Sequence, residues 1–151
     1  MKGYLIDTNI LSEYNRPGGP HAGVKRWLET VGRQWQYVSV ITLAEIQKGI
    51  ELLANGKRRT QLERWLNQEL IAWFSGRILS VDYQVARRWA SLVATRIQKG
   101  KPLPTVDSLI AATALAHGLT VITRNVRDFE DTGVMTFNPW ESDPSLIQMH
   151  P

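Results

Sequence analysis

Residues 4–11 read Tyr-Leu-Ile-Asp-Thr-Asn-Ile-Leu, so that a short apolar run meets an acid, Asp7, where a helix-like pattern begins. Similar changes of pattern recur along the chain, at Glu45, at Asp107, and at Asn125 with Asp128. The carboxyl ends of parallel strands share one edge of a sheet, which is where ligands bind in open α/β folds. We therefore expect these side chains to meet in one pocket, although they are spread over more than a hundred residues.

The alternation of apolar strands with amphipathic helices predicts an α/β fold with a central parallel sheet of four to five strands, covered by helices on both faces. Short apolar runs predict strands at residues 3–6, 36–40, 78–81, 119–123 and 134–137. Helical spacing of apolar residues predicts helices over 8–14, 22–32, 42–55, 58–74, 83–98 and 105–117.

One domain is expected over residues 1–140, followed by a peripheral tail over 141–151. The chain lacks cysteine, which excludes disulfides and cysteine-based zinc sites. It has no apolar run near the roughly 18 residues of a transmembrane helix, and its N-terminus lacks the apolar core of a signal peptide. These features predict a cytoplasmic protein without a membrane segment.

Positive charge is concentrated in the middle of the chain. Residues 46–104 contain eleven Lys or Arg and four acids, for a net charge of +7, whereas the remainder carries −3. A basic surface around an acidic pocket suits a polyanion that is processed with metal ions. The alternative is that these Lys and Arg side chains only solvate long helices.

Each acid, taken singly, is better explained as part of a helix N-terminus than as a ligand. Asp7 is a candidate N-cap for a helix that begins at Thr8. Glu45 completes a capping box that starts at Thr42, and Asp107 lies in the first turn of its helix, where the dipole favours an anion. The pair Asn125 and Asp128 resembles a cap followed by an acid at the third position.

The joint pattern favours a metal site. Asp7 directly follows buried apolar residues, and Glu45 flanks the apolar stripe of its helix. Carboxylates gathered in one pocket repel one another, and a divalent cation relieves that repulsion. Ligands that are all oxygen suit Mg²⁺ or Mn²⁺ rather than zinc. Such an ion suits phosphodiester hydrolysis, because it acidifies a bound water and neutralises phosphate oxygens.

Other chemistries find little support in the sequence. His21, His117 and His150 are isolated, and no HExxH spacing or Ser/His/Asp arrangement is evident. His117 is interpreted as the end of a helix before Gly118. No Gly-rich phosphate-binding motif of the P-loop or dinucleotide-binding type occurs.

With these residues in place, the chain resembles the PIN-domain ribonucleases, specifically the VapC-type toxins of toxin–antitoxin pairs. Four pieces carry the resemblance in the family's order: Leu5–Asn9, Ser39–Gly49, Asp107–Ala114 and Thr123–Phe129. Together they extend from residue 4 to about residue 140. One piece alone is weak, whereas four in order at plausible spacings are specific.

The resemblance implies a three-layer α/β/α domain and a Mg²⁺- or Mn²⁺-dependent endoribonuclease that cuts structured RNA and arrests translation. It implies that Asp7 and Asp107 are principal metal ligands and that Glu45 completes the acidic shell. Thr8 and Asn9 would support the pocket by hydrogen bonds. The family often has an acid at the position of Asn125, and here Asp128, three residues on, would supply a fourth catalytic carboxylate.

The resemblance also implies a homodimer that is inhibited by a small antitoxin protein covering the active-site groove. Trp65, Trp73 and Trp89 lie on helices that are candidates for such surfaces, although large aromatic residues more often fill a core. Arg16, Lys48 and Arg124 lie near the pocket in sequence and are candidate contacts for RNA phosphates.

The leading hypothesis is a metal-dependent endoribonuclease toxin. Two alternatives remain: a nuclease of the same fold that processes RNA without an antitoxin, and a non-catalytic domain that binds nucleic acid or a partner and keeps the acids as helix caps.

Overall fold

Five short strands form one parallel sheet in the order β3-β2-β1-β4-β5, as the apolar runs predict. The computed structural model describes residues 2–141, so the predicted tail lies, except for its first residue, outside the described residues. The strands are β1 Tyr4–Ile6, β2 Gln36–Ser39, β3 Ile78–Leu79, β4 Thr120–Ile122 and β5 Thr136–Phe137.

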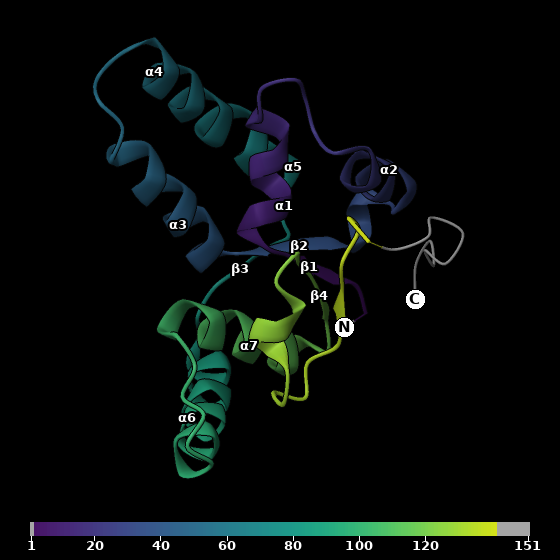
Figure 1. Cartoon of the computed structure of the whole chain (residues 1–151), viewed down its shortest axis with the longest axis vertical. Helices are drawn as coiled ribbons and strands as arrows, with labels where there is room; N and C mark the ends of the chain where they lie inside the picture. The colour runs from purple at the N-terminus through teal and green to yellow at the C-terminus, as the bar shows by residue number, and fades with distance from the viewer. Residues whose placement is uncertain (1, 142–151) are drawn as a thin grey trace.

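Helices connect the strands and form the outer layers (Figure 1). They are α1 Thr8–Ser12, α2 Ala22–Thr30, α3 Val40–Glu51, α4 Lys57–Arg64, α5 Ile71–Trp73, α6 Tyr83–Gln98 and α7 Thr105–His117. Shorter 3₁₀ segments are η1 Glu13–Asn15, η2 Arg33–Trp35 and η4 Val126–Phe129, and η3 Trp65–Leu70 is a π-helix that joins α4 to α5. Within residues 2–141, no helix combines the length and the hydropathy needed to cross a membrane.

The sheet divides two hydrophobic cores, as expected when neighbouring residues of a strand point to opposite faces. Ile6 and Ile122 pack with α1, α2, α3, η3 and α5 on one face. Leu5 and Val121, one position earlier in the same strands, pack with α6 and α7 on the other. The predicted three-layer α/β/α architecture is confirmed.

The order of the strands places a switch point between β1 and β4. From β1 the chain continues to β2 and β3 on one side of the sheet, and it later adds β4 and β5 on the other. Ile6 of β1 lies opposite Ile122 of β4. Residues that follow these two strands are therefore neighbours at the carboxyl edge, which is where a doubly wound sheet opens a crevice.

Two helices differ from the predictions. The helix expected from Thr42 begins at Val40, because the Ser39 side chain accepts a hydrogen bond from the Ile41 backbone N–H at 3.0 Å and acts as the N-cap. The helix expected over 58–74 contains the π-helical turn η3, which the spacing of its apolar residues did not indicate. The predicted end of α7 at His117 is confirmed by Gly118, which has a left-handed φ of 65°.

Candidate active site

Asp7 lies between α1 and the end of β4. Its Oδ1 accepts a hydrogen bond from the Thr8 backbone N–H at 2.8 Å, so the predicted N-cap is correct. Its Oδ2 accepts a hydrogen bond from the Thr123 hydroxyl at 2.7 Å and one from the Asn9 side-chain amide at 3.3 Å. One carboxylate therefore caps a helix and is also anchored to a strand that is more than a hundred residues away.

The Thr123 hydroxyl is the centre of this corner. Thr123 is fully buried, and its hydroxyl also accepts hydrogen bonds from the Asn125 backbone N–H at 3.0 Å and the Asn9 amide at 3.4 Å. The Oδ1 of Asn9 in turn accepts a hydrogen bond from the Arg124 backbone N–H at 3.2 Å. The supporting role expected of Asn9 is thus visible as a hydrogen-bonded link between the segments after β1 and β4.

Glu45 lies one and a half turns into α3 and forms an exposed ion pair with Lys48 at 3.2 Å. The capping box that starts at Thr42 is wrong, because α3 begins earlier and Ser39 provides its cap. An exposed ion pair of this kind contributes about 0–1 kcal/mol, so the carboxylate exchanges partners at little cost.

Asp107 is half-buried in the first turn of α7, and no described side chain donates a hydrogen bond to its carboxylate. Desolvation raises its pKa above the usual value for Asp, and the carboxylates of Asp128, Asp7 and Glu45 raise it further. Acids from three other segments are therefore close enough to act on Asp107.

Asp128 and Asn125 lie at the exposed rim. Asp128 belongs to η4, and its backbone N–H donates to the Asn125 carbonyl at 3.1 Å. The Asn125 side chain makes no capping hydrogen bond, so its interpretation as a helix cap is wrong. Of the two, Asp128 is the one that acts on Asp107 electrostatically.

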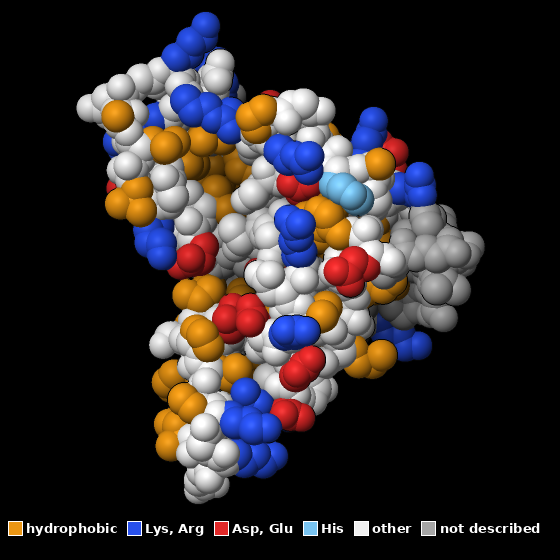
Figure 2. Space-filling model, in the orientation of Figure 1, with side chains coloured by type: hydrophobic (Ala, Val, Ile, Leu, Met, Phe, Trp, Pro, Cys, Tyr) orange, Lys and Arg blue, Asp and Glu red, His pale blue; other side chains and the backbone are white. Residues whose placement is uncertain are grey.

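The three candidate RNA-binding cations are exposed around this region. Arg16 pairs with Glu13 at 3.0 Å, Lys48 pairs with Glu45, and the Arg124 guanidinium lies 5.1 Å from the ring centre of Trp140. In Figure 2, acidic and basic side chains alternate over the middle of this face. Their contact with RNA stays a prediction.

The donor atoms suit a hard divalent cation. Every titratable group that acts on Asp107 is a carboxylate, and oxygen ligands of this kind favour Mg²⁺ or Mn²⁺. Within residues 2–141, no three acidic or histidine side chains are gathered as tightly as in a metal site made by protein alone. Mg²⁺ keeps several waters and uses one or two carboxylates, so the residues present fit such an ion.

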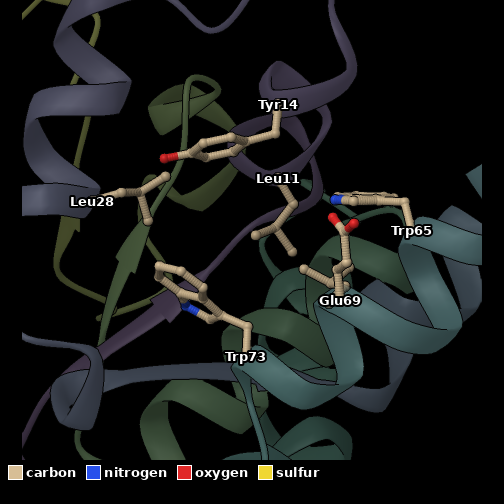
Figure 3. Close-up of a pocket in the computed structure, with 7 residues that line it drawn as sticks. Leu11, Tyr14, Leu28, Trp65, Glu69 and Trp73 are labelled. Atoms are coloured by element: carbon tan, nitrogen blue, oxygen red, sulfur yellow. The ribbon is translucent and has the colours of Figure 1, made fainter.

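A separate apolar cavity of about 180 Å³ lies between α1, α2 and the η3–α5 segment. Figure 3 shows Tyr14, Leu28 and Trp73 facing one another across it, with Trp65 and the Glu69 carboxylate side by side at one wall. Trp65 and Trp73 are partly buried against the core, which confirms the core interpretation, and they also line this cavity; their place in an interface stays a prediction.

The family is decided by the extent of the match. The sequence pattern of the family described as PIN domain matches residues 4–134. The chain belongs to the PIN domain family. Toxin FitB of Neisseria gonorrhoeae is similar to it, with 41% identity over 90% of this chain and 97% of its own length. A VapC ribonuclease of Sinorhizobium fredii is 37% identical over 91% of this chain and 97% of its own.

A solved structure supports the same family assignment. The structure of FitAB bound to a DNA fragment superposes on this PIN domain with a TM-score of 0.86 and 38% identity, covering 93% of this chain and 97% of that chain. The resemblance inferred from the four sequence motifs is therefore confirmed.

Sequence analysis included Thr123 in the fourth motif and at the end of a strand, but it gave the side chain no role in the candidate site, because a threonine there is an ordinary β-residue. Its position opposite the Leu-Ile-Asp run, in a second strand that ends just before polar residues, was the available signal.

Proposed function

We propose that this PIN domain is a metal-dependent endoribonuclease and the toxin of a toxin–antitoxin pair, cutting structured RNA and thereby inhibiting translation. The observation that carries the proposal is the position of Asp107 beside Asp128, Asp7 and Glu45, which belong to three other segments; burial first, and then these carboxylates, raise the pKa of Asp107. A cluster of mutually repelling acids costs stability and is typical of functional sites. The names of the relatives, a toxin and a VapC ribonuclease, support the same activity.

The alternative in which the acids serve only as helix caps loses support from the structure. Only Asp7 caps a helix through its side chain. Glu45 lies beyond the first turn of α3, so its capping interpretation is wrong. Asp107 does lie in the first turn of α7, where the helix dipole favours an anion, so that interpretation is confirmed. It does not account for the three other carboxylates that act on Asp107.

Asp7 and Asp107 would be the principal ligands of the divalent ion, Glu45 would complete the acidic shell directly or through water, and Asp128 would lie at the rim. The chemistry that bound Mg²⁺ or Mn²⁺ supplies is neutralisation of phosphate oxygens and a lowered pKa for a water molecule. Thr123 and Asn9 fix the Asp7 carboxylate, while the exposed Lys48 and Arg124 are suited to contact the RNA phosphates. Exposed cations of this kind position RNA without reading its sequence.

The cavity of Figure 3 is a suitable seat for the antitoxin. Solved structures that resemble this chain include a toxin–antitoxin complex. Tyr14 is 42% exposed at the cavity mouth, and Glu69 adds a negative charge. A partner segment with an apolar side chain next to a Lys or Arg would complement both. Tyr14→Asp should prevent co-purification of the co-expressed antitoxin, whereas Met135→Asp, at another exposed apolar position, should not.

The proposal includes a homodimer acting in the cytoplasm, where RNA and ribosomes are found. Tyr83 and Ile97 on α6 are large apolar residues that are 75% and 60% exposed, respectively. We expect a second copy of the chain to bury them in the dimer interface. Sedimentation of the purified chain tests the dimer, and a concentration-independent monomer would contradict it.

Induced expression of the wild type and of Asp7→Asn tests the central claim. Asparagine is as good an N-cap as aspartate, so the variant keeps the start of α1. It removes the charge and replaces the Oδ2 acceptor of the Thr123 and Asn9 hydrogen bonds with an amide. We expect growth arrest and RNA cleavage with the wild type alone. Equal toxicity of the two proteins would contradict the metal-nuclease mechanism.

A pull-down from the native host distinguishes the toxin from the alternative, a nuclease that processes RNA without an antitoxin. Recovery of the chain together with a small DNA-binding protein supports the toxin, and recovery of the chain alone, from cells that grow normally, supports the alternative.

A further inference from the structure

A second cavity opens beside the candidate active site. It has a volume of about 280 Å³ and lies between α1, α3 and the start of α4. Figure 2 shows the face hollowed between these helices, with hydrophobic atoms on the floor of the hollow. We call it the α3–α4 cavity; its lining comprises Thr8, Ser12, Asn15, Glu45, Ile46, Gly49, Ile50, Arg58, Leu62 and Trp65.

The α3–α4 cavity is continuous with the acidic centre. Thr8 and Glu45 line it, and the Thr8 backbone N–H is hydrogen-bonded to Asp7. A group at the Thr8 and Glu45 end of this cavity is therefore next to the acidic centre.

The lining combines flat apolar surface with polar groups at one end. Trp65 contributes an indole, and Ile46, Ile50 and Leu62 contribute aliphatic walls. At the other end, Arg58 donates a hydrogen bond from one Nη to the Asn15 carbonyl oxygen at 2.7 Å and keeps its other donors for a ligand. Unstacked RNA bases are bound by such surfaces, through stacking on aromatic or guanidinium planes and hydrogen bonds to their edges.

One polar atom in the lining has no acceptor. The side-chain Nδ2 of Asn15 is buried and donates no hydrogen bond within the described residues. An unsatisfied buried donor costs about 1–3 kcal/mol. Because Asn15 lines the cavity, a rotation of its side chain that turns Nδ2 toward the edge of a bound base would remove this cost.

We propose that the α3–α4 cavity is a nucleobase subsite, which takes the unstacked base of a nucleotide next to the cut phosphodiester and gives the nuclease a preference at that position. This inference rests on the proposed function and adds a specificity determinant to it. Arg58 and Asn15 read the edge of the base, and Trp65 stacks on its face.

A protein segment is the other candidate occupant, and the cavity favours the base. Its volume is slightly below the range of about 300–1,000 Å³ for small-molecule sites, so it accommodates one planar ring system rather than a helix. It also contains the cation Arg58, which suits the negatively charged backbone of RNA, whereas the cavity of Figure 3 contains the acid Glu69.

Binding is tested without catalysis. The ¹⁵N-labelled full chain carrying Asp107→Asn is titrated with AMP, GMP, CMP and UMP, and with ribose 5-phosphate as a probe that lacks a base. The Asn15 side-chain amide signals are assigned by their loss in Asn15→Asp. We expect these signals to shift with at least one nucleotide and not with ribose 5-phosphate. Unchanged signals with all four nucleotides would overturn the proposal.

Specificity is tested by cleavage of an RNA pool randomised in sequence, followed by sequencing of the new ends. Arg58→Ala should reduce the preference at one position beside the cut about tenfold, the effect of losing one charge-assisted hydrogen bond. Arg59→Ala is the matched control, because Arg59 is the next residue, carries the same charge, and bonds Glu63 at 3.0 Å outside the cavity.

The outcomes separate the two proposals. If wild type leaves the RNA uncut while the nucleotides still shift the Asn15 signals, the nuclease fails and the subsite stands. If wild type and Arg58→Ala cut with the same preference, or if Arg58→Ala weakens only binding of a co-expressed antitoxin, the subsite proposal is overturned. Asn15→Asp, compared with the exposed Asn67→Asp on η3, repeats the test with a second residue of the lining.

Discussion

Replacing Thr123 with valine removes one buried hydroxyl from the active-site corner and changes almost nothing else in shape. The hydroxyl donates to Asp7 Oδ2 at 2.7 Å and accepts from the Asn125 backbone N–H at 3.0 Å. Thr123 has no exposed surface, so water cannot replace the hydroxyl. Asp7 keeps the Thr8 and Asn9 hydrogen bonds, and Asn125 is exposed enough to bond water.

The expected loss is therefore that of one hydrogen bond to a charged group, about 1.5–3 kcal/mol in the free energy of unfolding. For a domain of this size, 1 kcal/mol lowers the melting temperature by about 2–4 °C. Thr123→Val should then melt about 3–12 °C below the wild type. Its RNA cleavage should fall as well, because the Asp7 carboxylate loses the contact that ties it to β4.

The assay is thermal unfolding followed by circular dichroism in EDTA at pH 7, together with cleavage at saturating Mg²⁺. Thr123→Ser is the control, since it keeps the hydroxyl and loses a methyl group. We expect serine to retain most of the activity. A valine variant that melts within about 2 °C of the wild type, the range of ordinary surface substitutions, would refute the role assigned to this hydroxyl.

Three further predictions follow from the same structure. Because burial and neighbouring carboxylates raise the pKa of Asp107, the metal-free fold binds a proton there more tightly than the unfolded chain. Its free energy of unfolding should therefore fall as pH rises from the ordinary Asp range through the raised pKa. Calorimetry against pH should show Asp107→Asn more stable than wild type at neutral pH and equal to it in acid. Mg²⁺ should raise the melting temperature of the wild type, by an amount equivalent to about 2.7 kcal/mol at a hundredfold excess over Kd, and should not raise that of Asp107→Asn; equal shifts would place the ion elsewhere. Gly23→Ala would put a Cβ 2.3 Å from the Pro139 carbonyl oxygen and should cost about 1–3 kcal/mol, whereas Gly49→Ala in α3 meets no neighbour within 4 Å and should stabilise the helix by about 0.5–1 kcal/mol, both measured by urea unfolding.

The strands were predictable because their apolar runs are local signals with clear boundaries. Leu5 and Ile6 must be buried on opposite faces, and the same holds for Val121 and Ile122, so the central sheet follows from composition and period alone. The acids were predictable for a related reason, since residues that follow parallel strands share one edge.

The parts that sequence reasoning did not find depend on the third dimension. Thr123 acquires its role from Asp7, 116 positions away, and nothing in its local sequence reports that contact. The start of α3 was placed at Thr42 because Ser39 was assigned to a strand, whereas its side chain also caps the helix that follows. Asn15 and Arg58 line one cavity although 43 positions separate them.

The π-helical turn η3 was not predictable from apolar spacing. A π-turn adds a residue to a helix and shifts the face that follows it, and such turns are often found at functional sites. Here it contains Trp65 and Glu69, which line the cavity of Figure 3, and Trp65 also lines the α3–α4 cavity.

The link between Asp7 and Thr123 has a consequence for how the protein is made. Asp7 and Asn9 leave the ribosome early, but the hydroxyl and the backbone N–H that fix them belong to Thr123 and Arg124. At about 5–20 residues per second, these partners are synthesised roughly 6–25 s after initiation. The nascent chain thus lacks a completed catalytic corner for most of its synthesis. A ribosome that produces this nuclease would finish most of the chain before the product can cut RNA.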